Sequence, residues 1–255
     1  MLSFHLADLS GFVLVYLLVF ARTGAMLMLL PPINQAGVSP RVRLVLALAI
    51  SAAMAPGLAH AYAIAPPASA IGLGVLVGEE VTAGLLVGGM ASIIMGALSV
   101  AGTVISAQTG LSYAQILNPA ENDQEPVLST FLTLLGGVMI FATNLHHLAI
   151  SAIQGSYTLI PPGAPLPTGD MAELVIRLVS GSFALGIQLS APFLIFGFAV
   201  NASFGLLARL LPQLQVFFIA APVNILTGFL LLMLLTGTMM TVFVDYYGQQ
   251  FANFG

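Results

Sequence analysis

Long apolar stretches separated by short polar connections are the feature that most constrains this chain. A helix needs about 20 apolar residues to cross the hydrocarbon core of a bilayer. Prolines mark the turns between the stretches, as at Pro31-Pro32 and Pro161-Pro162. The pattern predicts an all-α integral membrane protein with six spanning helices. The predicted helices cover residues 9–30, 44–64, 71–107, 127–160, 171–208 and 215–247.

The helical interpretation follows from the lipid that would surround such stretches. Lipid offers no hydrogen-bond partners, so only helices and closed barrels satisfy the backbone within it. A barrel requires alternating strands of about ten residues, whereas these stretches are continuously apolar. Several of them exceed one crossing: a helix over residues 71–107 would extend roughly 55 Å. Such lengths predict helices that tilt strongly, break, or leave the membrane plane.

Charged side chains are scarce, and this excludes several classes of function. Only 5% of the residues are charged, whereas about 25% is usual for a soluble domain. Five arginines and a net charge of −4 cannot follow a phosphate backbone, which excludes a nucleic-acid binder. Cysteine and lysine are absent, so thiolate metal sites, Schiff-base chemistry and a phosphate-binding G-x-x-x-x-G-K loop are excluded. The sequence therefore predicts no cofactor and no metal.

Three charges lie inside the apolar stretches: Arg22 in the first, and Glu79 and Glu80 near the start of the third. Intramembrane charges are costly and usually functional. Arg22 either forms an interior ion pair or caps carbonyl groups of neighbouring helices, or it extends to the membrane interface. Adjacent helical positions point about 100° apart. In one arrangement, Glu79 and Glu80 face different surroundings, and one of them faces a partner or water. In the other, both lie among lipid headgroups.

Two histidines, His146 and His147, interrupt the fourth stretch beside Asn144. A proton relay is one interpretation of histidines in a membrane. The sequence favours another, in which neutral imidazoles hydrogen-bond helix partners, because no carboxylate lies within one turn.

Glycines recur at four-residue spacing in the third stretch. Small residues at this spacing let helix backbones approach closely in lipid. The alternative is that glycine is simply common in membrane helices. Their repetition within one segment favours close helix contacts, inside the chain or with a partner. The glycines are Gly74, Gly78, Gly84 and Gly88.

The segment 110–126 differs from everything around it, since it holds three acids, Glu121, Asp123 and Glu125, and no cation. It also carries the apolar pair Ile116 and Leu117 in its front half. One interpretation is a segment that re-enters the protein and lines or blocks a path, which non-helical backbone does where it faces water or protein. The other is an ordinary acidic loop.

Four stretches together resemble the FliR/SctT-like family of type III secretion export-gate proteins. They follow the family's order and span most of the chain. The stretches are FARTGAMLMLLPPINQAGVSPRVRLVLALAIS (20–51), GLSYAQILNPA (110–120), NLHHLAISAIQGSYTLIPPG (144–163) and LLARLLPQLQVFFIAAPVNILTGF (206–229).

The resemblance implies a non-enzymatic, multi-pass subunit of a bacterial inner-membrane export gate in the flagellar basal body. Residues 1–208 would resemble a FliP-like partner and residues 209–255 a FliQ-like hairpin. The subunit would assemble with FliP-like and FliQ-like proteins, near FlhB-like and FlhA-like proteins, and pass unfolded flagellar proteins. The resemblance also implies a channel plug in the central loop. The plug-like residues are Gly110, Leu111, Ser112, Tyr113, Ala114, Gln115, Ile116, Leu117, Asn118 and Pro119.

Two alternatives remain open from the residues themselves. The first is a self-contained secondary transporter or small-solute channel that uses Glu79, Glu80, Arg22 and His147, although the halves of the chain show no convincing repeat. The second is a membrane enzyme using His146, His147 and Glu80, which lack the spacing of metal-binding motifs such as H-E-x-x-H.

Overall fold

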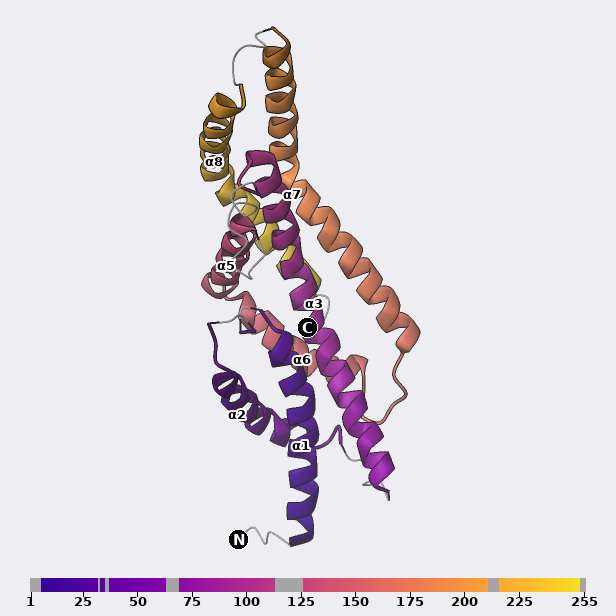
Figure 1. Cartoon of the computed structure of the whole chain (residues 1–255). Coiled ribbons are helices and arrows are strands. Elements are labelled where there is room, and N and C mark those ends of the chain that lie inside the picture. The colour runs from indigo at the N-terminus through magenta and orange to yellow at the C-terminus, as the bar shows by residue number, and fades with distance from the viewer. Residues whose placement is uncertain are drawn as a thin grey trace. The chain divides into compact units, whose positions relative to one another are not determined.

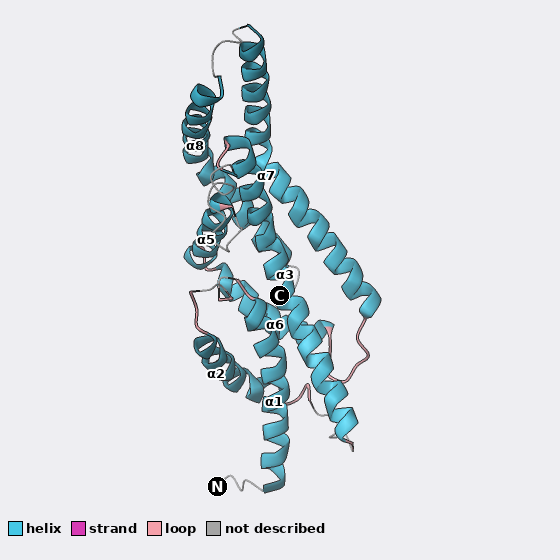
Figure 2. Ribbon diagram, viewed as in Figure 1, coloured by secondary structure: helices cyan, strands magenta, loops and turns pink. Residues whose placement is uncertain are grey.

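The computed structural model describes residues 6–31, 33–34, 37–62, 69–112, 126–210 and 216–252. These residues form helices and no strand, as Figure 2 shows. The helices are α1 (Leu6–Leu29), α2 (Pro40–Leu58), α3 (Ala70–Thr109), α5 (Val127–Ala142), α6 (Leu145–Leu159), α7 (Thr168–Leu210) and α8 (Val216–Ala252). Five are long and apolar enough to cross a membrane, and α5 with α6 form a sixth, bent candidate. The prediction of an all-α membrane protein is confirmed.

Local sequence explains where two of the helices begin. Ser39 precedes α2, and its hydroxyl accepts a hydrogen bond from the Val42 N–H. Pro40 then occupies the first turn, where its missing N–H is harmless. Ser69 plays the same part for α3, since its Oγ lies 3.1 Å from the Gly72 nitrogen. Side-chain oxygens of this kind satisfy N–H groups that have no partner within the helix.

The fourth apolar stretch, predicted as one segment over 127–160, is divided into α5 and α6. The Thr143 N–H still bonds back to the Met139 carbonyl, and then Asn144 turns to a left-handed conformation with φ of 59°. Asparagine tolerates this conformation better than most residues with a side chain. The helix therefore breaks beside the two histidines.

The chain forms two compact units, each assembled from separate segments. The first unit comprises residues 1–92, 144–177 and 248–255, and the second comprises residues 93–143 and 178–247. Three helices, α3, α7 and α8, contribute to both. The predicted division into 1–208 and 209–255 concerns resemblance to other proteins rather than compactness, and it stays a prediction.

In the first unit, α1 packs against α2 and against the N-terminal half of α3 (Figure 1). The Tyr16 hydroxyl of α1 donates to the Leu48 carbonyl of α2 at 3.3 Å. Apolar side chains of α1 and α3 fill the core, among them Leu18, Met26 and Val87. This packing encloses the charged groups described below.

In the second unit, the C-terminal half of α3 packs against α5, α7 and α8. Buried side chains of this half include Ile94, Leu98 and Ile105. The hydroxyl groups of Ser99 on α3 and Ser129 on α5 lie 2.9 Å apart. The C-terminal half of α3 is therefore the centre of this unit, and its end is held by the surrounding helices.

Candidate functional site

Arg22 on α1 and Glu80 on α3 form a buried ion pair in the first unit. Their side chains are almost fully enclosed, with Arg22 1% exposed and Glu80 0% exposed. Arg22 Nε lies 2.6 Å from Glu80 Oε2, and Nη2 lies 3.2 Å from Oε1, so the contact has two parallel hydrogen bonds. This geometry suits the planar guanidinium group. Of the arrangements left open for Arg22 by the sequence, the structure shows the interior ion pair.

The remaining donors of Arg22 reach α6. Nη1 donates to Ser156 Oγ at 3.1 Å, and Nη2 donates to the Ile160 carbonyl at 3.0 Å. The last carbonyl groups of a helix have no partner within it, and Pro161 and Pro162, which follow, have no N–H to offer. Arg22 therefore also caps the C-terminal end of α6 with a positive charge, which the helix dipole favours.

Two tyrosines complete the surroundings of Arg22. Its guanidinium carbon lies 4.0 Å from the centre of the Tyr157 ring, a cation–π distance. The Tyr62 hydroxyl, after α2, donates to the Tyr157 hydroxyl at 3.4 Å. We call Arg22, Glu80, Tyr62, Ser156, Tyr157 and the Ile160 carbonyl the arginine cluster.

Sequence reasoning singled out Arg22 and Glu80 but missed the other members of the arginine cluster. Ser156 and Tyr157 form a polar pair near the end of α6, and the Pro161-Pro162 step begins four residues after Tyr157. That position was the available signal, because a helix end in an apolar environment needs polar partners. Nothing local marks Tyr62, whose contact with Tyr157 joins residues 95 positions apart.

Two of the four predicted glycines lie where α1 and α3 touch. A Cβ atom at Gly84 would overlap the Arg22 carbonyl group, and one at Gly88 would overlap the Met26 carbonyl group. From the first contact to the second, the residue number rises by four on both helices, from Gly84 to Gly88 and from Arg22 to Met26. The helices α1 and α3 therefore run parallel here. At Gly74 and Gly78, by contrast, an added Cβ would meet no neighbouring group within 4 Å among the described residues. Close approach at Gly84 brings the Arg22 backbone next to the turn that carries Glu80.

The other predicted polar residues lie apart from the arginine cluster. Glu79 is half-buried and forms no ion pair with the described residues. The rings of His146 and His147 lie 4.1 Å apart at the start of α6. His147 is exposed, and in the described part of the first unit it forms no hydrogen bond or ion pair with Arg22 or Glu80. Of the four residues of the transporter hypothesis, the structure therefore joins two.

The plug-like loop is described only at its beginning. Gly110 ends α3 in a left-handed conformation with φ of 80°, and Gly110, Leu111 and Ser112 are half-buried. The predicted residues 113–119 and the acidic part of the loop lie outside the described residues.

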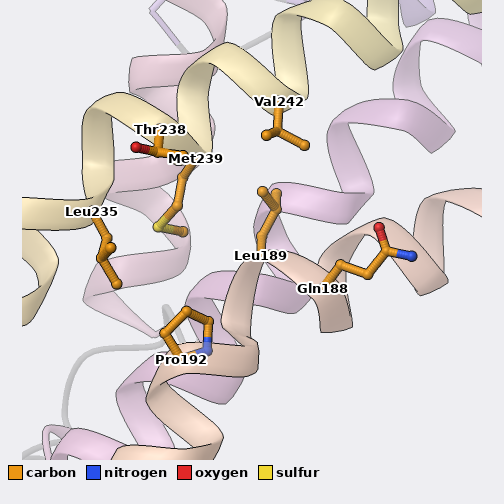
Figure 3. Close-up of a pocket in the computed structure, with 7 residues that line it drawn as sticks. All are labelled: Gln188, Leu189, Pro192, Leu235, Thr238, Met239 and Val242. Atoms are coloured by element: carbon orange, nitrogen blue, oxygen red, sulfur yellow. The ribbon is translucent and has the colours of Figure 1, made fainter.

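Potential metal ligands do not gather in the described part of the chain. No three histidine, aspartate or glutamate side chains there are placed to hold a metal ion. A cavity of about 240 Å³ lies between α7 and α8 in the second unit (Figure 3). It presents apolar side chains with one amide and one hydroxyl and carries no acid or base. Its lining residues are Gln188, Leu189, Pro192, Leu235, Thr238, Met239 and Val242.

Long apolar helices and a charge pair enclosed among them define a multi-pass α-helical membrane protein. Residues 13–250 match the family model described as bacterial export proteins, family 1. The chain therefore belongs to this family of bacterial export proteins.

Named relatives cover most of the chain. It is 40% identical over 238 residues to the flagellar biosynthetic protein FliR of Caulobacter vibrioides, covering 93% of this chain and 94% of the relative. It is 28% identical to the protein of the same name in Escherichia coli, covering 84% and 81%. It is also 29% identical to Yop proteins translocation protein T of Yersinia pestis, covering 89% and 88%.

Proposed function

We propose that this protein is a non-enzymatic subunit of a flagellar type III export gate in the bacterial inner membrane. The observation that carries the proposal is the match over almost the whole chain to a flagellar biosynthetic protein. The described site agrees with it, because the arginine cluster joins helices and its polar groups bond one another. Hydrogen bonds of this kind between helices suit a structural role.

The length of the apolar surface supports assembly with partner subunits. On α7, exposed apolar side chains continue from Val179 to Leu210 within the second unit. A helix of this length extends about 46 Å, whereas the hydrocarbon core is about 30 Å thick. Helices tilted by up to about 40° would still leave part of this surface outside lipid. We infer that FliP-like and FliQ-like subunits cover it, near FlhB-like and FlhA-like proteins.

The export role is tested by deleting the gene and restoring it from a plasmid. We expect hook and filament proteins to disappear from the culture medium, together with swimming, and both to return with the plasmid. An empty plasmid is the control. Continued secretion and swimming in the deletion strain would show that the protein serves another process.

The plug part of the proposal concerns residues 110–126, which we place in the channel of the gate. Deleting residues 111–124 is expected to leave assembly with partners intact and to make the membrane leaky to small ions, because the obstruction is gone. Ion conductance of membranes from cells that express the whole gate measures this effect, with copurification of partners as the control. Normal conductance in a normally assembled gate would contradict the plug.

A further inference from the structure

The C-terminal end of α3 is capped by a side chain from a distant helix. The last carbonyl groups of a helix lack partners within it, and an unpaired carbonyl is costly in an apolar environment. In the second unit, Asn224 of α8 donates from Nδ2 to the Gln108 carbonyl at 3.1 Å. Gln108 lies one residue before the end of α3, so this amide satisfies one of those carbonyl groups.

Two glycines leave room for this end of α3. A Cβ at Gly197 on α7 would overlap the Gln108 side chain, and one at Gly228 on α8 would overlap the Thr109 side chain. Gly228 lies one turn beyond Asn224, on the same face of α8. The last turn of α3 therefore packs closely against α7 and α8, and Asn224 forms a hydrogen bond to it.

The side chain at the end of α3 does not replace the hydrogen bond from Asn224. The Thr109 hydroxyl turns back to the Ile105 carbonyl at 2.9 Å, so it serves an earlier turn. Gly110 then leaves the helix with φ of 80°, a conformation that glycine adopts without the strain of a side chain. The position at which the chain leaves α3 thus depends on Gly110 and on the hydrogen bond from Asn224.

We propose that Asn224 is a positioning residue that acts through the Gln108 carbonyl and fixes where the chain leaves α3 at Gly110. The proposal concerns residues 108–112, which the structure describes. It bears on export only through the proposed function, in which the segment that starts at Gly110 is a plug.

The absence of cysteine from the chain allows a direct test. Leu111→Cys introduces one thiol into a half-buried position next to Gly110. In the complex purified with its partners, we compare the rate of reaction of this thiol with a soluble maleimide before and after Asn224→Leu. Leucine has a similar size but no donor. We expect the rate to rise about fivefold, the change that loss of one hydrogen bond produces in an opening equilibrium.

Asn224→Ala is a second variant, and Asn201→Leu is the matched control. Asn201 is exposed on α7 and forms no hydrogen bond with the described part of α3. An unchanged labelling rate in both Asn224 variants would overturn the proposal. Loss of both from the membrane while Asn201→Leu accumulates would also overturn it, since Asn224 would then be needed for folding as a whole. The labelling rate tests the role of Asn224, and ion conductance tests the plug. Failure of one proposal can therefore be distinguished from failure of the other.

Discussion

Loss of either charge of the Arg22–Glu80 pair is expected to remove most of the folded protein from the membrane, and loss of both is expected to restore much of it. Arg22→Leu leaves the Glu80 carboxyl buried without its two hydrogen bonds, and Glu80→Leu leaves the guanidinium without its counter-charge. Removing one partner of a buried pair costs about 3–5 kcal/mol, whereas replacing both with apolar residues is often neutral. The effects of the two substitutions are therefore strongly non-additive.

The double variant is not expected to recover fully. The Ser156 hydroxyl loses the donor that Arg22 supplies. It still donates its own hydrogen to the Ile153 carbonyl at 2.6 Å. The Ile160 carbonyl, however, loses the donor that Arg22 supplies. A missing hydrogen bond at a buried carbonyl costs about 1–3 kcal/mol, so a partial deficit remains.

The measurement is the amount of protease-resistant protein in the membrane, followed by secretion of hook and filament proteins. Arg177→Leu is the control for a charge change, since Arg177 forms an exposed pair with Glu173 within one turn of α7. Exposed pairs of this kind contribute little. Equal losses in the single and double variants would contradict a mutually dependent pair. A double variant that folds but does not export would instead support a transport role for these charges.

The sequence alone predicted the number and approximate limits of the apolar segments, because the cost of burying backbone in lipid constrains them strongly. It left open which of Glu79 and Glu80 is buried, although the glycine spacing contained part of the answer. Glu80, Gly84 and Gly88 repeat every four residues and so share one face of α3, whereas Glu79 points about 100° away. Gly78 points about 120° from the middle of that face, and both Gly74 and Gly78 have open space around them among the described residues.

Other features depend on contacts that no local pattern reveals. Asn224 lies 116 residues from the carbonyl that it caps. Its sequence context, an asparagine two residues after a proline in an apolar helix, is equally compatible with a local hydrogen bond. The division of the fourth stretch into α5 and α6 rests on the backbone conformation of Asn144, and asparagine makes such a turn possible without requiring it.

Gly84→Leu and Gly88→Leu are expected to separate α1 from α3 and abolish assembly of the gate. At both positions the new side chain meets a backbone carbonyl of α1, from Arg22 or Met26. A helix backbone cannot move aside as a flexible side chain does, so the helices must part, and overpacking alone typically costs about 1–3 kcal/mol. At Gly84 the shift also pulls Arg22 away from Glu80, which exposes the protein to the larger cost of an unpaired charge.

Gly78→Leu is the matched control, since it makes the same substitution on the same helix in open space. Protease resistance in the membrane reports folding of the chain, and copurification of partners reports assembly. We expect Gly84→Leu and Gly88→Leu to lose both properties and Gly78→Leu to keep its protease resistance. If Gly78→Leu folds but loses its partners, the first glycine pair contacts another subunit. Normal folding of Gly84→Leu would contradict the close contact of α1 with α3, and with it the explanation of how Arg22 is held against Glu80.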